Sequence, residues 1–141
     1  MQDAGPALVT AFFEAKTILT EKEGDADGEL WGGMLMNVFR ALDQCKEAEK
    51  FEDALAENIK EELEGNGQVL TIEKMTELNL NIVPTAKAFW LAVSEQKEEG
   101  KKEMEQWCQI LSACTGAENT EEGVTRFAAF TEGGLNVEDF L

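Results

Sequence analysis

The stretch Gly134-Leu135-Asn136-Val137-Glu138-Asp139-Phe140 decides how the rest of the sequence is interpreted. It contains a glycine, an aliphatic residue, a small polar residue and then two acids followed by phenylalanine. This order is typical of the second half of a helix–loop–helix unit, in which one hydrophobic residue enters a short strand and acids open the next helix. Less complete versions of the pattern occur at three earlier places, so the sequence predicts four such units.

The apolar residues recur at helical spacing and predict eight short helices. These cover roughly residues 6–19, 30–49, 51–63, 71–80, 84–95, 103–114, 121–130 and 136–141. Breaks rich in glycine and charged residues separate them, for example at Gly65-Asn66-Gly67. We therefore expect an all-α fold in which four helix–loop–helix units pack as one compact globular domain over residues 1–141. Its N-terminal lobe would cover about 6–80 and its C-terminal lobe about 84–141.

The composition excludes several classes of function. Hydrophobic residues make up 43% of the 141 residues, which is enough to bury a core, and histidine is absent. The absence of histidine excludes imidazole-based acid–base catalysis and His-ligated zinc. A formal net charge of −17 argues against binding to nucleic acid or to anionic membranes, since both require clustered Lys and Arg. Such acidity favours calcium, cationic partners, simple solubility or mimicry of nucleic acid.

The cysteines and the N-terminus indicate a cytoplasmic protein. Cys45, Cys108 and Cys114 are odd in number and show no CxxC spacing, which argues against a disulfide framework and a zinc site. We expect buried thiols in a reducing compartment. The sequence shows neither a signal-peptide pattern nor a membrane-spanning apolar run, although Met1 leaves open whether a leader was removed.

The first predicted loop carries half of a calcium-binding pattern. Calcium loops of twelve residues supply oxygens from positions 1, 3, 5, 7, 9 and 12, with glycine at position 6. With Gly28 at position 6, the candidate ligands at positions 1, 3 and 5 are Glu23, Asp25 and Asp27. Met34 falls at position 12, where a bidentate carboxylate is needed. The alternative is an acidic glycine turn that holds no ion.

The second predicted loop is the most complete. With Gly67 at position 6, it places candidate ligands at positions 1, 3, 5 and 12, namely Glu62, Glu64, Asn66 and Glu73. The hydrophobic residues Ile59 and Leu63 before it are out of register with a working loop. This favours the alternative, an empty turn that caps a helix.

The third and fourth predicted loops lack ligands. The third, from Ser94 to Glu105, contains three lysines that would repel a divalent cation. In the fourth, only four residues separate Phe130 from Leu135, which is about three too few to wrap an ion. We therefore expect calcium to bind weakly or not at all, and no other cofactor.

The C-terminal half resembles the third hand of the invertebrate sarcoplasmic calcium-binding proteins, a family of EF-hand proteins. The residues that carry the resemblance are Ala88–Val93, a charged loop, Glu105, Trp107 and Ile110-Leu111, while Glu64–Val69 is similar to the degenerate second hand of that family. The resemblance implies four EF-hands around a large shared core and a cytosolic buffering role. Photoproteins and luciferin-binding proteins, which resemble the same family, hold an organic ligand in that core.

Aromatic and methionine residues at inward-looking helical positions form a second candidate site. They are Trp31, Met34, Phe39, Trp90, Trp107 and Phe127. They are either ordinary core residues or the lining of a cavity for a small hydrophobic ligand. The luciferin-handling relatives use histidine and tyrosine around their ligand, and this chain has neither, so bioluminescent chemistry is not expected.

The sequence predicts a non-enzymatic EF-hand-like protein with lost or weakened calcium binding. It would act as an interaction module for a protein partner or as a carrier of a small hydrophobic ligand. The alternative is an acidic all-helical inhibitor that mimics nucleic acid, although the four glycine-rich breaks argue against it. An enzyme is not expected, because no phosphate loop, nucleophile elbow or metal cluster organises the carboxylates.

Overall fold

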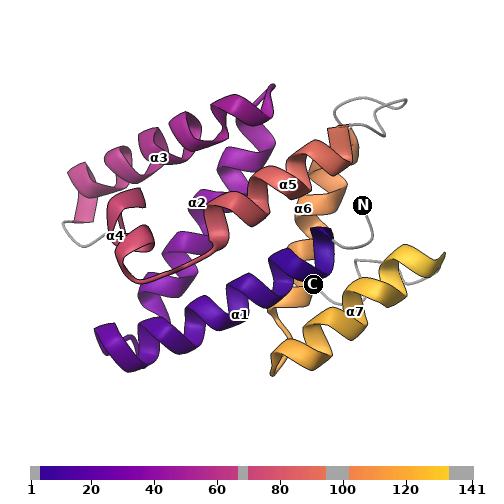
Figure 1. Cartoon of the computed structure of the whole chain (residues 1–141), viewed down its shortest axis with the longest axis horizontal. Coiled ribbons are helices and arrows are strands. Elements are labelled where there is room, and N and C mark those ends of the chain that lie inside the picture. Colours follow the sequence, from indigo (N-terminus) through magenta and orange to yellow (C-terminus); the bar gives the residue numbers. More distant parts are fainter. Residues whose placement is uncertain (1–3, 67–69, 95–101, 134–141) are drawn as a thin grey trace.

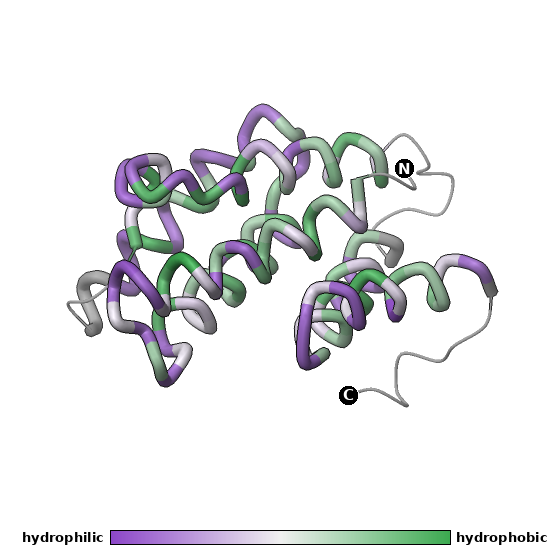
Figure 2. The backbone as a smooth tube through the Cα atoms, turned by 60° about the horizontal axis from the view of Figure 1, so that its bottom comes forward, coloured by the Kyte–Doolittle hydropathy of each residue, from purple (hydrophilic) through white to green (hydrophobic). Residues whose placement is uncertain are grey.

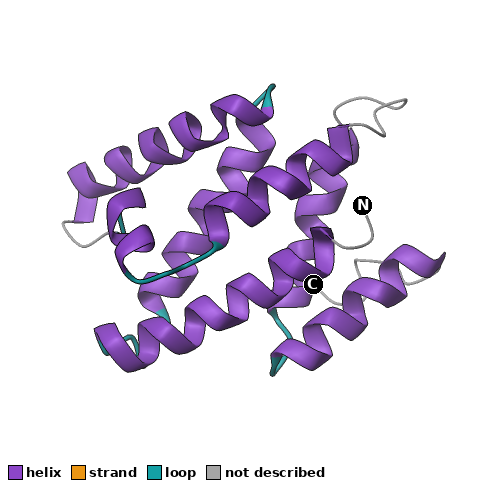
Figure 3. Ribbon diagram, viewed as in Figure 1, coloured by secondary structure: helices purple, strands orange, loops and turns teal. Residues whose placement is uncertain are grey.

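The computed structural model describes residues 4–66, 70–94 and 102–133, and its regular structure in these ranges is entirely helical (Figure 3). The elements are α1 (Ala4–Glu23), α2 (Glu29–Gln44), a 3-10 turn (Ala48–Lys50), α3 (Phe51–Asn66), α4 (Ile72–Glu77), α5 (Ile82–Ser94), α6 (Lys102–Thr115) and α7 (Thr120–Gly133). The predicted all-α class is confirmed. The stretch 134–140, the predicted helix 136–141 and most of the third predicted loop lie outside the described residues.

Helix α1 is the centre of the packing. Its buried residues lie on several sides of the helix: Gly5, Leu8, Val9, Ala11, Phe12, Phe13, Ala15 and Leu19. A helix that is apolar around most of its circumference is covered by neighbours on more than one side. In Figure 1, α5 runs beside α1, and α1 also contacts α7, α6 and α2.

Helices α2 and α3 form a second packed pair. The core continues into them through fully buried residues such as Val38, Leu42, Phe51 and Leu55. Figure 2 shows hydrophobic and hydrophilic residues recurring in turn along the helices, as expected for amphipathic helices around one core. No helix in the described ranges combines the length and apolar character needed to cross a membrane.

Several predicted helix ends were wrong. Helix α1 continues to Glu23 instead of ending near Leu19, and its threonine hydroxyls bond to carbonyls one turn earlier, as Thr20 does to Lys16 at 2.8 Å. Helix α5 begins at Ile82, two residues before Pro84, because a proline in the first turn gives up only an N–H that has no helical partner. Helix α7 runs to Gly133, which makes the first residues of the predicted fourth loop helical.

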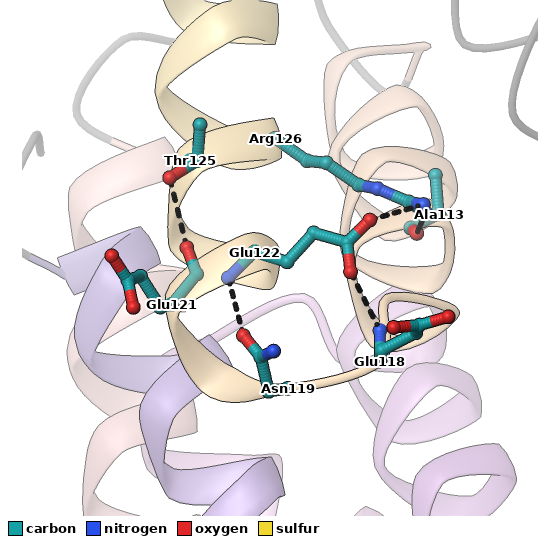
Figure 4. A network of polar contacts seen from close by, with 7 residues as sticks. All are labelled: Ala113, Glu118, Asn119, Glu121, Glu122, Thr125 and Arg126. Atoms are coloured by element: carbon teal, nitrogen blue, oxygen red, sulfur yellow. Dashed lines mark hydrogen bonds and ion pairs between the residues drawn. The ribbon is translucent and has the colours of Figure 1, made fainter.

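The turn between α6 and α7 is fixed by side-chain hydrogen bonds (Figure 4). The Asn119 side chain accepts a hydrogen bond from the backbone N–H of Glu122 at 2.9 Å, and the Glu122 carboxylate accepts one from the backbone N–H of Glu118 at 3.0 Å. This reciprocal arrangement caps the start of α7. Arg126 pairs with Glu122 of the same helix at 3.0 Å. It joins α7 to α6 by donating to the carbonyl of Ala113 at 3.1 Å.

Helices α1 and α7 approach closely at two glycines. A methyl group at Gly5 would lie 1.9 Å from the ring of Phe127. A methyl group at Gly123 would lie 2.8 Å from the ring of Phe13 and 3.1 Å from the backbone carbonyl oxygen of Cys114. The two helices can therefore pack at this distance only with glycine at both positions.

We predict that Gly123→Ala lowers the free energy of unfolding by about 1–3 kcal/mol, the usual cost of overpacking, even though alanine favours helices. Gly32→Ala is the control, because nothing lies within 4 Å of the added methyl group in α2. It should stabilise the protein by about 0.5–1 kcal/mol. Urea unfolding measures both, and equal effects would contradict the close approach of α1 and α7.

We also predict that the Glu122 cap weakens in acid. The Glu118 N–H and the Arg126 guanidinium lower the pKa of Glu122 below its ordinary value of 4.5. Stability from a lowered pKa is present above the ordinary value and is lost as the pH falls through the lowered one. Glu122→Gln should therefore be less stable than the parent at pH 7, and the gap should shrink by pH 3. The exposed neighbour Glu121→Gln should show no such trend in urea unfolding at the two pH values.

Candidate functional site

The turn between α1 and α2 is short and depends on glycine. Five residues, Gly24–Gly28, connect the two helices, and both terminal glycines have positive φ, 68° and 71°. This backbone region is open to glycine at little cost. Residues 29–34, which fall in the second half of the predicted twelve-residue loop, are helical. The predicted loop from Glu23 to Met34 is therefore replaced by a five-residue turn.

Asp25 holds this turn to the start of α2. Asp25 is only 8% exposed. Its two carboxylate oxygens accept hydrogen bonds from the backbone N–H groups of Leu30 and Trp31, each at 3.0 Å. These N–H groups are among those that have no partner inside the helix. The negative charge also lies at the positive end of the helix dipole. Asp25 thus acts as a helix cap in this structure.

A pocket of about 500 Å³ collects carboxylates from both predicted N-terminal loops. It is lined by Glu23, Gly24, Asp25, Asp27, Glu29, Leu30 and Glu62. The structure therefore brings together four of the seven predicted metal ligands, three from the first loop and Glu62 from the second. We call this surface the acidic pocket.

Two carboxylates of the acidic pocket have side-chain partners. Glu23 pairs with Lys74 of α4 at 3.0 Å, and this hydrogen bond and the charge of Glu23 raise the pKa of Lys74. Glu62 accepts a hydrogen bond from the side-chain amide of Asn37, which is 3% exposed. The Asn37–Glu62 bond links α2 to α3, and a small cavity of about 30 Å³ lies beside it. Asp27 and Glu29 are exposed.

The other three predicted ligands are placed differently. Glu64 and Asn66 belong to the last turn of α3, so positions 3 and 5 of the second predicted loop are helical. Glu73 is exposed in the first turn of α4, which is capped by Thr71 through a bond from the Lys74 N–H at 3.1 Å. Within residues 4–66, 70–94 and 102–133, no three acidic or cysteine residues group closely enough to hold a metal ion.

The aromatic residues near α1 fill space around that helix. The indole N–H of Trp31 donates to the backbone carbonyl of Phe12 at 2.7 Å, and the ammonium group of Lys16 lies 4.8 Å from the Trp31 ring. Phe39 packs edge-on against Phe12, with ring centroids 5.6 Å apart. These contacts fasten α2 to α1.

A second aromatic group joins α5, α6 and α7. Trp107 stacks on Phe127 with centroids 5.8 Å apart and meets Phe89 edge-on at 6.1 Å. Trp90, 5% exposed, donates its indole N–H to the carbonyl of Cys45 at 3.3 Å.

Two of the six predicted pocket residues line separate pockets. Met34 lines the 30 Å³ cavity, and Trp90 lines a separate pocket of about 260 Å³. The other four pack within or against the hydrophobic core. The structure therefore places this set as core and near-core residues.

Sequence reasoning missed two residues of the acidic pocket region, Glu29 and Asn37. Glu29 follows Gly28 directly and opens α2, so an acid in a first helical turn was the available signal. Asn37 is a polar residue on an otherwise apolar helix face, three residues after Met34. A buried amide of this kind needs a hydrogen-bonding partner, but its identity depends on the packing of α2 against α3.

We predict that Asp25→Ala lowers the free energy of unfolding by about 1–2 kcal/mol, the cost of losing a helix cap. The control is Asp27→Ala, which removes an exposed carboxylate from the same turn and should change stability by less than about 0.5 kcal/mol. Thermal and urea unfolding with calcium or with a chelator should give the same difference. A loss that appears only with calcium would mean that Asp25 is a metal ligand instead.

Comparisons with known proteins found no relative of this chain. No protein-family model matches the sequence, and neither a curated protein nor a solved structure matches it.

Proposed function

We propose that this protein is a non-enzymatic, EF-hand-like binding module that has lost calcium binding and uses the acidic pocket to hold a cationic segment of a protein partner. The observation that carries the proposal is the position of Asp25 between the helix and the pocket. Both of its carboxylate oxygens accept backbone hydrogen bonds from α2. Because both oxygens already accept hydrogen bonds, Asp25 supports a turn whose polar groups are satisfied without an ion.

The length of the first turn supports the loss of calcium binding. A calcium loop draws six to eight oxygens from twelve residues. Here five residues separate α1 from α2, and the second half of the predicted loop, residues 29–34, lies within α2. The bidentate position is occupied by Met34, which is 3% exposed and has no oxygen in its side chain.

The charge of the pocket supports a cationic partner. Its lining includes five carboxylates, two of them on the exposed residues Asp27 and Glu29, within a chain of net charge −17. Such a field attracts positively charged segments over a distance of about a Debye length. Leu30 in the lining offers an apolar contact for the methylene stem of a lysine or arginine.

The thiol of Cys114 supports a non-catalytic protein. Burial raises the pKa of Cys114 to about 12. It is therefore protonated near neutral pH, and the thiol is a far weaker nucleophile than the thiolate. A hydrophobic-ligand carrier has less support, because the aromatic residues that would surround the ligand pack within or against the core.

We predict that isothermal titration with calcium detects no site tighter than about 10 μM, the weak end of the sensor range. Among the residues that the structure describes, no three acidic or cysteine side chains group closely enough to hold one ion, and Asp25 is occupied by backbone N–H groups. One or more tighter sites would refute the loss of calcium binding. That result would leave the cationic partner to be tested separately.

The partner is tested with a lysine-rich peptide of about ten residues. We predict that the double variant Asp27→Asn/Glu29→Gln weakens its binding about fivefold, because two exposed ion pairs contribute about 0.5 kcal/mol each. The control, Asp53→Asn/Glu57→Gln, makes the same charge change on exposed residues of α3 outside the pocket lining. Fluorescence anisotropy with a labelled peptide measures both. Equal weakening would mean that net charge, and not the pocket, binds the peptide.

A further inference from the structure

Two cysteine side chains approach the same stretch of α2 from different elements. Cys45 ends that helix, and its thiol lies 3.7 Å from the carbonyl oxygen of Leu42. Cys108 reaches across from α6, and its thiol lies 3.9 Å from the carbonyl oxygen of Phe39. Phe39 and Leu42 are three residues apart, which is about 4.5 Å along a helix axis. The two thiols therefore lie against neighbouring carbonyls of one helix.

The two cysteines of α6 have different electrostatic environments. Burial is the main cause of the raised pKa of Cys108, and the nearby Asp43, Cys45 and Glu105 raise it further. Cys114 has a different environment, since it is fully buried and its charged neighbour is Arg126.

A solvent-open pocket gives access to the pair. It has a volume of about 260 Å³ and is lined by Asp43, Gln44, Cys45, Lys46, Trp90, Met104 and Glu105. Met104 and Glu105 precede Cys108 by four and three residues on α6, so the three share one helix face. A small oxidant in this pocket would contact Cys45 directly and would lie over the α6 face that carries Cys108.

We propose that Cys45 and Cys108 are a redox pair, which a hydroperoxide oxidises to a disulfide that ties the end of α2 to α6. In the first step the Cys45 sulfur takes one oxygen of hydrogen peroxide, which gives a sulfenic acid and releases one water. In the second step the Cys108 sulfur attacks the sulfenic sulfur and the S–S bond forms. The hydroxyl leaves with the Cys108 proton as a second water.

The hydrogen bonds from the two thiols to backbone carbonyls are weak. Each thiol must leave its backbone carbonyl, and thiols are weak hydrogen-bond donors. Both sulfurs lie beside one end of α2, and the bond would close a loop that includes α3, α4 and α5. Such a link stabilises the folded chain mainly by restricting the unfolded one.

The test is to treat the full chain with excess hydrogen peroxide, block remaining thiols by alkylation and map the products by protease digestion and mass spectrometry. The parent and Cys114→Ala should contain an intramolecular Cys45–Cys108 disulfide that a dithiol reductant reverses. Cys45→Ala and Cys108→Ala should contain none. The map of the parent alone decides the matter if a variant fails to fold.

Three results would overturn the proposal. They are a disulfide that includes Cys114, a disulfide between two chains on a non-reducing gel, and oxidation of Cys45 to sulfinic or sulfonic acid without any link to Cys108. A parent in which all three thiols are still alkylated after peroxide treatment would also overturn it.

Discussion

The structure depends on the burial of α1 on several sides. Phe12, Leu8 and Val9 are fully buried, and the helix touches α2, α5, α6 and α7. Its buried residues lie on several sides of the helix, so several neighbours pack against α1 at once. The close approach at Gly5 and Gly123 makes this arrangement sensitive to single methyl groups. A side chain added there would separate helices that bury much of the core.

The acidic pocket follows from this packing and from a competition for one carboxylate. Asp25 can satisfy two backbone N–H groups or coordinate a cation, and in this structure it does the former. Two other acids of the pocket also have partners within the protein. Glu23 pairs with Lys74, and Glu62 binds Asn37. The surface that results is negatively charged, and three of its carboxylates bind groups of the protein.

Helical periodicity predicted the all-α class and several helix starts, because these depend on residues close in sequence. Phe51 begins α3 as expected, and α6 begins one residue before its predicted start. The extent of α3 was missed, because Gly65 and Asn66 usually end helices, yet here they stay helical. The end of α1 was missed because its last turn carries mainly polar residues, and no apolar pattern marks a helix there.

Part of the candidate site could also be predicted, because it depends on residues close in sequence. Glu23, Asp25 and Asp27 lie within five residues, so any short turn brings them together. That Glu62 joins them depends on how α2 packs against α3, which no local pattern encodes. The sequence also did not reveal the role of Asp25. A carboxylate three residues before a glycine fits a metal-binding loop and a helix cap equally well.

The position of α1 has a consequence for how the chain is made. The helix that α5 and α7 cover is synthesised before both of them, and α7 is completed about 110 residues later, at Thr120–Gly133. At a typical rate of about 5–20 residues per second, its apolar surface waits several seconds for those partners. Contacts between such distant segments also slow folding compared with helical proteins whose contacts are local. The acidic composition then has a second use, since repulsion between nascent chains keeps that uncovered surface from associating with other copies.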